Sequence, residues 1–248
     1  MTVSAIVLAA GEGSRMRSSR PKPLHLICGR PMVMHVIHAL QDVAPERTVV
    51  VVGHGAERVT KKVQEQAPAW ANVTFVEQTV QRGTGDAAMV GLGAFPGDDL
   101  DDNSTIVVLP GDTPLLSADT LDNLVATHNA NEYAATLITS VLEDPAGYGR
   151  VIRQPSKHGD GRVLGIVEQR DATEEQRAVR EVCTSMYAFR RDLLGPALRR
   201  LSPDNAQGEY YLTDVVATLA AMGHRVGSVS APAAETQGVN DRWQLALA

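Results

Sequence analysis

The sequence predicts an α/β protein built on a doubly wound, Rossmann-like and mostly parallel sheet. In the first half of the 248-residue chain, short runs of β-branched residues alternate with amphipathic helical patterns, which is typical of parallel strands joined by crossover helices. The first apolar run also leads directly into a loop rich in glycine and basic residues. Ligands of such sheets bind beyond the carboxyl ends of the strands, so we expect the loops after the strands to form a site.

The expected elements follow this alternation in order. Strands are predicted at residues 4–8, 48–52, 74–77 and 105–109, and helices at residues 32–40, 58–66, 86–92 and 118–128. The second half is less regular, with strand patterns at 134–141, 149–153, 162–168 and 182–189 and helical patterns at 192–201 and 212–222. Gly, Pro and polar turns join these strands, so we expect the sheet to continue into a hairpin-rich lobe.

The composition restricts the classes of protein to which the chain can belong. A net charge of −6 excludes a general nucleic-acid or anionic-membrane surface, so we expect no such partner. The two cysteines, Cys28 and Cys183, are too few for a disulfide framework and suit a reducing cytoplasm. The apolar run at residues 3–10 has no basic segment before it, and no apolar stretch is long enough to span a membrane. We therefore predict a cytoplasmic protein.

The loop after the first strand has the chemistry of a triphosphate site. Gly11 and Gly13 allow the backbone to approach phosphate oxygens, and Arg15 and Lys22 add a planar guanidinium and a compact ammonium. The dinucleotide fingerprint needs Gly where Met16 stands, and the Walker sequence Gly-Lys-Ser/Thr is absent. A basic surface turn is the alternative, but the added Arg and Pro-Lys argue against it.

Two further groups of residues have side chains that could bind metal ions. The acidic run at residues 98–103 departs from the Asp-x-Asp-x-Asp-Gly spacing of a calcium loop, so a solvated loop is the preferred interpretation. His35 and His38 lie three residues apart on a helical pattern, but no further ligand completes a zinc site nearby. We expect these histidines to pack in the fold or to face solvent.

Several motifs in a fixed order make the chain resemble the sugar-nucleotide pyrophosphorylases, which have the nucleotide-diphospho-sugar transferase type of fold. Besides the opening loop, they are Gln78 with Gly-Thr-Gly at 83–85, Gly-Asp-Thr-Pro-Leu at 111–115, Asp-Pro-Ala-Gly-Tyr-Gly-Arg at 144–150, Ile-Val-Glu at 166–168, the run at 205–214 and Gly-Val-Asn at 238–240. The resemblance covers nearly the whole chain. It is greatest to the uridyltransferase half of the bifunctional N-acetylglucosamine-1-phosphate uridyltransferase/glucosamine-1-phosphate acetyltransferases.

The resemblance implies a single nucleotidyltransferase domain, with a nucleotide-binding lobe at residues 1–116 and a sugar-binding lobe at residues 117–248. It implies no hexapeptide-repeat acetyltransferase domain in this chain. The residues that match the family's functional positions fall into four groups. The implied catalytic residues are Arg15, Lys22 and Asp112; the nucleotide-binding residues are Leu8, Ala9, Ala10, Gly11, Lys22, Gln78, Gly83 and Thr84; the sugar-binding residues are Gly149, Glu168, Tyr211, Thr213 and Asn240; and the ligands of Mg2+ are Asp112 and Asn240.

Residue chemistry agrees with these roles and leaves alternatives open. Asp112 follows an apolar strand and offers carboxylate oxygens to a hard cation, or it belongs to a Gly-Asp turn that is followed by a helix cap. Asn240 and Thr84 could each be a helix N-cap. Glu168 could be a solvent-facing strand residue.

The chain departs from the family pattern at Cys183 and, in smaller ways, at Glu12, Ser14, Pro23, Asp86 and Pro110. Cys183 stands where the family usually has a sugar-binding Asn, and Asp86 stands where His is common. A thiol is only a weak donor and acceptor, so one sugar contact is expected to be lost or transferred to Thr184. The identity of the sugar therefore depends on this position more than the reaction does.

The expected activity is Mg2+-dependent uridylyl transfer from UTP to N-acetylglucosamine 1-phosphate, which gives UDP-N-acetylglucosamine and pyrophosphate for peptidoglycan and cell-wall synthesis. Two alternatives stay open: a pyrophosphorylase for another sugar 1-phosphate or nucleotide, and a catalytically weak sensor of nucleotide sugars. The presence of Arg15, Lys22 and Asp112 argues against the sensor, because a mere binder has little need to stabilise a leaving pyrophosphate. The oligomeric state stays open.

Overall fold

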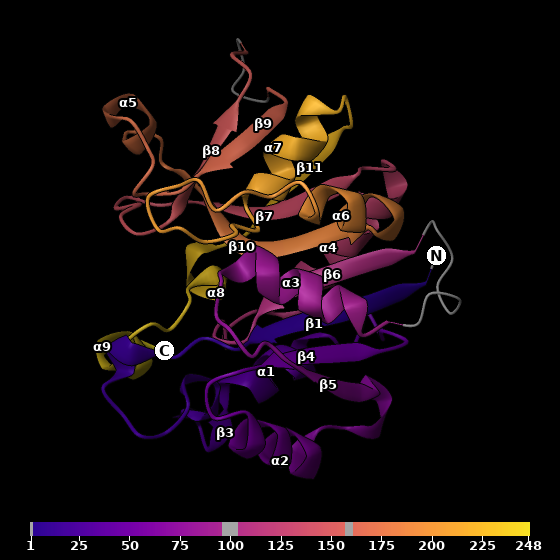
Figure 1. Ribbon diagram of the computed structural model, residues 1–248, viewed down its shortest axis with the longest axis vertical. Helices are drawn as coiled ribbons and strands as arrows, with labels where there is room; N and C mark the ends of the chain where they lie inside the picture. Colours follow the sequence, from indigo (N-terminus) through magenta and orange to yellow (C-terminus); the bar gives the residue numbers. More distant parts are fainter. Residues whose placement is uncertain (1, 96–103, 157–160) are drawn as a thin grey trace.

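The computed structural model describes residues 2–95, 104–156 and 161–248 (Figure 1). Within these residues a nine-stranded sheet has seven strands in the order β11-β7-β10-β6-β1-β4-β5, and β8 and β9 are attached through β10. The strands of this sheet are β1 (Val3–Ala9), β4 (Thr48–Val52), β5 (Val73–Glu77), β6 (Thr105–Pro110), β7 (Ala135–Val141), β8 (Gly149–Arg153), β9 (Val163–Val167), β10 (Glu181–Arg190) and β11 (Val226–Ser230). The acidic run at residues 98–103 lies outside the described residues.

The parallel part of the sheet confirms the predicted fold class. β1 pairs in parallel with both β4 and β6, and β4 pairs in parallel with β5. The ends of these four strands differ from the predicted ones by at most one residue. β-branched residues make up most of them, and such side chains pack well on a pleated surface that is covered on both sides.

Helices cover both faces of the sheet (Figure 1). One face carries α1 (Met32–Ala39), α2 (Ala56–Gln66) and α4 (Ala118–Ala130). The other carries α3 (Thr84–Gly93), α6 (Arg191–Leu198) and α7 (Asp214–Ala221). Side chains alternate along a strand, so Val7 of β1 packs in the first layer and Ile6 in the second. The doubly wound arrangement therefore buries both sides of the sheet.

The second half of the chain extends the same sheet with antiparallel strands. β10 pairs antiparallel with β6, β7 and β8, and β8 pairs antiparallel with β9, so the predicted hairpin-rich extension is present. The sequence patterns missed β11, which alternates Val with Gly and Ser and pairs in parallel with β7. They also missed several short elements: β2 (Leu26–Ile27), β3 (Arg30–Pro31), α5 (Glu174–Arg177), α8 (Ala233–Thr236) and the 3-10 turns at Ser14–Met16, Lys22–Leu24 and Ala69–Ala71. The C-terminal helix that the N-cap alternative for Asn240 requires is present as α9 (Arg242–Leu247).

The loops that follow the parallel strands meet at one edge of the sheet. The backbone N–H of Gly111, just after β6, donates to the carbonyl oxygen of Leu8 at 2.8 Å. That of Gln78, just after β5, donates to Val52 at 2.8 Å, and that of His54, just after β4, donates to Ala10 at 3.2 Å. This edge therefore holds the predicted phosphate, base and metal positions in adjoining loops. Of the helices in the described residues, none combines the length and the apolar character that crossing a bilayer requires.

Candidate active site

The glycine-rich loop after β1 is shaped around Lys22. Gly13 has a φ of +65°, and a Cβ at this position would lie 2.5 Å from Lys22 Cβ. Only glycine therefore fits both the backbone conformation and the passage of the lysine side chain. In this loop the side chain of Met16 is buried, whereas Gly11 and Arg15 are exposed. Pro23 is the second residue of the turn Lys22–Leu24, where it removes no needed hydrogen bond.

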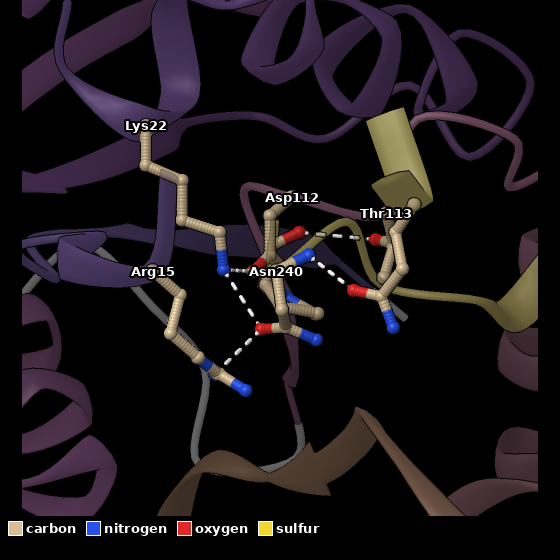
Figure 2. A network of polar contacts seen from close by, with 7 residues as sticks. Arg15, Lys22, Asp112, Thr113 and Asn240 are labelled. Atoms are coloured by element: carbon tan, nitrogen blue, oxygen red, sulfur yellow. Dashed lines mark hydrogen bonds and ion pairs between the residues drawn. The ribbon is translucent and has the colours of Figure 1, made fainter. Parts of the chain in front are cut away.

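Side chains from three distant segments converge beside this loop (Figure 2). The Lys22 ammonium forms an ion pair with Asp112 and also donates to Asn240 Oδ1 at 3.0 Å. Arg15 Nη2 donates to the same Asn240 oxygen at 3.0 Å. The Val239 N–H donates to the Asp112 carbonyl oxygen at 2.8 Å, which holds the C-terminal segment against the loop after β6. The structure thus brings together Arg15, Lys22, Asp112 and Asn240.

The helix-cap alternative for Asn240 is wrong, whereas Asp112 does lie in a turn that a helix cap follows. The N-cap of α4 is Ser117, whose hydroxyl accepts from the Thr120 N–H at 3.2 Å. The N-cap of α9 is Asp241, whose carboxylate accepts from the Gln244 N–H at 2.8 Å. Because neighbouring residues do the capping, the side chains of Asp112 and Asn240 are left for the cationic cluster.

The oxygens of Asp112 and Asn240 form a donor set that suits a hard divalent cation. They already share a positive charge, the Lys22 ammonium, and carboxylate and amide oxygens are typical ligands of Mg2+. Among the described residues, no cluster of three or more His, Cys, Asp or Glu side chains could hold a metal alone. Two protein oxygens are enough for Mg2+ when substrate phosphates and water supply the remaining ligands.

The predicted base-binding residues lie at the start of α3. Gln78 is buried, and its Nε2 donates to the Gly83 carbonyl oxygen at 3.2 Å and to the Asp86 carboxylate at 2.7 Å. The expectation that Thr84 could cap α3 is wrong, because Gly83 occupies the N-cap and the Thr84 hydroxyl accepts from the Leu212 N–H at 3.1 Å. Leu8, Ala9, Ala10 and Gly11 run past the same edge, where the carbonyl oxygens of Leu8 and Ala10 already accept from neighbouring loops.

The predicted sugar-binding residues fall into two places. Glu168 accepts a hydrogen bond from the Thr213 hydroxyl at 2.9 Å. A Cβ on Gly149 would lie 3.5 Å from Glu168 Oε1 and 2.8 Å from Ile166 Cγ2, so the glycine leaves room beside the carboxylate and also permits close packing. Burial raises the pKa of Glu168, and the Thr213 hydroxyl opposes this shift. Asn240, by contrast, lies with Lys22 and Asp112.

Tyr211 contributes to the same region from the segment before α7. Its ring is buried, and its hydroxyl accepts from Gln207 Nε2 at 2.9 Å. Burial raises the Tyr211 pKa, the hydrogen bond from Gln207 opposes this shift, and the charges of Asp171 and Glu168 add to it. Glu168 is not simply a solvent-facing strand residue, because it contacts Thr213 and is only partly exposed.

Two residues of the 144–150 motif were not assigned roles from the sequence. Burial raises the pKa of the Tyr148 hydroxyl, and the charge of Asp112 raises it further. The guanidinium of Arg150 is fully buried and donates to the Tyr148 carbonyl oxygen and, at 2.7 Å, to Gln169 Oε1. Arg150 thereby ties the residue before Gly149 to the residue after Glu168.

Cys183 lies opposite Gly149 in the pairing of β10 with β8. Its thiol is buried and donates to the Tyr187 hydroxyl at 3.2 Å, and burial raises its pKa to about 12. Transfer of the missing sugar contact to Thr184 finds no support, because the buried Thr184 hydroxyl donates to the Ile138 carbonyl oxygen at 2.8 Å. Cys183 is therefore an unreactive packing residue at the border of the predicted sugar site.

Comparisons with known proteins show the family to which the chain belongs. The family model for the MobA-like NTP transferase domain matches residues 5–218. The bifunctional protein GlmU of Thermobifida fusca is 49% identical over 246 residues, which are 99% of this chain and 49% of that protein. That of Mycobacterium tuberculosis strain H37Ra is 48% identical over 245 residues, with 98% and 48% covered. The chain thus spans about half the length of the curated relatives it matches.

Two solved structures share the fold. UDP-glucose pyrophosphorylase complexed with UDP-glucose aligns with a TM-score of 0.71 at 17% identity, covering 92% of this chain and 90% of that one. A putative glucose-1-phosphate thymidylyltransferase from Bacillus anthracis aligns with a TM-score of 0.74 at 18% identity, covering 99% and 93%. At these identities the likeness concerns the fold alone.

Proposed function

Because the chain belongs to the MobA-like NTP transferase domain family, we propose that it transfers the uridylyl group of UTP to N-acetylglucosamine 1-phosphate. The observation that carries this proposal is the convergence of Arg15, Lys22, Asp112 and Asn240 at the carboxyl edge of the parallel strands. Similarity to the GlmU proteins over nearly the whole chain supports the choice of substrates. The product, UDP-N-acetylglucosamine, would serve peptidoglycan synthesis in the cytoplasm.

The reaction is a displacement at phosphorus. A phosphate oxygen of the sugar 1-phosphate attacks the α-phosphorus of UTP, and a new P–O bond forms between them. The bond from the α-phosphorus to the oxygen shared with the β-phosphorus breaks, and pyrophosphate leaves with that electron pair. Negative charge builds up on the leaving group, so the protein's task is mainly to position the phosphates and to neutralise them.

We assign the neutralising role to the cluster around Lys22. The Lys22 ammonium and the Arg15 guanidinium lie on the glycine loop, where their N–H groups can donate hydrogen bonds to the leaving phosphates. Asp112 and Asn240 would hold Mg2+, which supplies charge stabilisation to the phosphates when bound. Nucleotidyltransferases of the GlmU type generally use a divalent metal, which supports this assignment.

For the sugar, we propose that Glu168 accepts hydrogen bonds from hydroxyl groups beside Gly149, with Tyr211 and Thr213 lining the same place. The charged carboxylate accepts such bonds with both oxygens, whereas the protonated form keeps less acceptor capacity and turns one oxygen into a donor. Burial raises the Glu168 pKa, so the neutral form is favoured below that pKa and the charged form above it. Affinity for the sugar should therefore weaken as the pH falls through the Glu168 pKa.

The replacement Thr213→Val tests this pH dependence. The Thr213 hydroxyl stabilises the charged carboxylate, so its removal should raise the Glu168 pKa further. The KM for the sugar phosphate should then begin to rise at a higher pH than in the wild type. The KM for the sugar phosphate is measured against pH for both proteins. Dividing the KM of the variant by that of the wild type at each pH removes the effect of ionisation of the sugar phosphate itself. A ratio that is constant over pH would contradict the assignment.

Replacing Cys183 tests the identity of the acceptor sugar. If N-acetylglucosamine 1-phosphate is the acceptor, Cys183→Asn should add an amide beside Gly149 and lower KM for this sugar about fivefold, the effect of one hydrogen bond of about 1 kcal/mol. Glucose 1-phosphate should change less. A wild type that prefers a sugar without the acetamido group, with no gain in the Asn variant, would assign a different acceptor.

The proposed function itself is tested by release of pyrophosphate from a panel of nucleoside triphosphates and sugar 1-phosphates. We expect the highest kcat/KM with UTP and N-acetylglucosamine 1-phosphate in the presence of Mg2+. Turnover with another sugar and UTP would keep uridylyl transfer and change the acceptor. Tight binding of UDP-N-acetylglucosamine without turnover of any pair would instead identify a sensor.

A further inference from the structure

Asp86 contacts the one side chain proposed to recognise the base. Asp86 is the third residue of α3 and is only 5% exposed, and its carboxylate accepts from Gln78 Nε2 at 2.7 Å. The Gly83 carbonyl oxygen accepts from the same Nε2 at 3.2 Å. An ionised carboxylate and a carbonyl group are acceptors only. The nitrogen of the Gln78 amide must therefore face them, and the amide can satisfy both in only one orientation.

The remaining atom of the amide is an acceptor. Among the described residues, no donor contacts Gln78 Oε1, and the backbone N–H groups of Gly83 and Thr84 donate to no partner. The start of α3 thus presents an unpaired acceptor together with unpaired backbone donors. Uracil and thymine offer the complementary pattern, because a ring N3–H lies between two carbonyl oxygens. Cytosine offers a lone pair at N3, which would face the lone pairs of Oε1.

We propose that Asp86 is a positioning residue that locks the Gln78 amide with its oxygen toward the base, and so selects a 2,4-dioxopyrimidine over cytosine. This inference rests on the proposed function, since it assumes that the base lies against Gln78. Asp86 itself contacts neither the substrate nor the reacting atoms. It acts by preventing rotation of the amide, which would place Nε2 toward the base and pair well with cytosine.

The contact of Asp86 with Arg82 is separable from this lock. Arg82 Nη2 donates to the other carboxylate oxygen, Oδ1, at 2.7 Å, while Gln78 uses Oδ2. The Arg82 side chain is 60% exposed. Arg82→Ala therefore removes a partner of Asp86 and leaves the acceptor that faces Gln78 in place.

The decisive variant is Asp86→Asn. Its side chain can turn an NH2 group toward Gln78, and the Gln78 amide can then rotate without losing its partner. We expect the ratio of UTP to CTP, both in Kd without sugar phosphate and in kcat/KM, to fall about tenfold or more, mainly through improved use of CTP. Arg82→Ala is the matched control and should keep the wild-type ratio.

Two further measurements keep the inference testable. Removing an acidic residue from the first turn of α3 lowers the stability of the helix start, so Tm is recorded for each variant. If Asp86→Asn does not fold, Asp86→Ser makes the same prediction, because a hydroxyl also donates or accepts. If a folded Asp86 variant keeps the wild-type ratio of UTP to CTP, Asp86 does not lock the Gln78 amide. The proposed function still holds in that case, provided that the wild type turns over UTP. A wild type that binds CTP as well as UTP, or does not use UTP, overturns the base assignment itself.

Discussion

Replacing Asp112 with Asn should lower kcat/KM for uridylyl transfer about a thousandfold, the upper range for the loss of one group that stabilises reacting phosphates. The substitution keeps the size of the side chain and a carbonyl oxygen that Lys22 can still contact, but it removes the charge proposed to hold Mg2+. The backbone contact from Val239 is unaffected. Activity should therefore fall far more than stability, and Tm should fall by only about 2–4 °C per kcal/mol lost.

The matched control for this variant is Asp192→Asn. Asp192 pairs with Arg190 much as Asp112 pairs with Lys22, and the two aspartate side chains are exposed to a similar degree, 27% and 24%. Arg190 pairs with Thr105 at the start of β6, the end of the strand opposite to the proposed site. Asp192→Asn should keep wild-type turnover. Magnesium-dependent turnover of Asp112→Asn within a few-fold of the wild type would remove Asp112 from the metal site.

Local patterns predicted the parallel half of the fold because each strand there carries its own signal. β4 is Thr followed by four Val residues, and nothing except a buried strand suits such a run. β11 has no comparable signal, since Gly227 and Ser228 interrupt its apolar residues. Its position in the sheet is set by pairing with β7. This contact joins segments far apart in the chain, so a short stretch of sequence cannot predict it.

Candidate site residues could be named from their motifs, but their contacts could not. The capping question shows why: Asn240 and Asp241 are adjacent and chemically similar, and only the direction of α9 decides which side chain caps it. The contact between Gln78 and Asp86 spans eight residues across a loop and a helix start. The sequence shows Asp86 where the family commonly has His. The contact of Asp86 with the Gln78 amide, however, depends on the folded geometry and could not be predicted.

Lys22→Ala is expected to have the next largest effect, a fall in kcat of about a hundredfold or more with little change in the KM for UTP. The reason is that charge on the leaving pyrophosphate develops during the reaction, so a fixed ammonium stabilises the transition state more than the bound substrate. Steady-state kinetics with UTP as the varied substrate separate the two quantities. A rise in KM with unchanged kcat would mean that Lys22 contributes only to binding.

The same prediction extends to Gly13, because the path of the Lys22 side chain depends on it. A methyl group at Gly13 would meet Lys22 Cβ at 2.5 Å and would also strain a backbone with a φ of +65°. Gly223→Ala separates these effects, since Gly223 has a φ of +86° and nothing within 4 Å of the added atom. Both variants carry a backbone penalty of about 1–2 kcal/mol, but only Gly13→Ala displaces the ammonium. Gly13→Ala should therefore lose kcat as Lys22→Ala does, while equal activity of the two glycine variants would show that the position of Lys22 does not depend on this close approach.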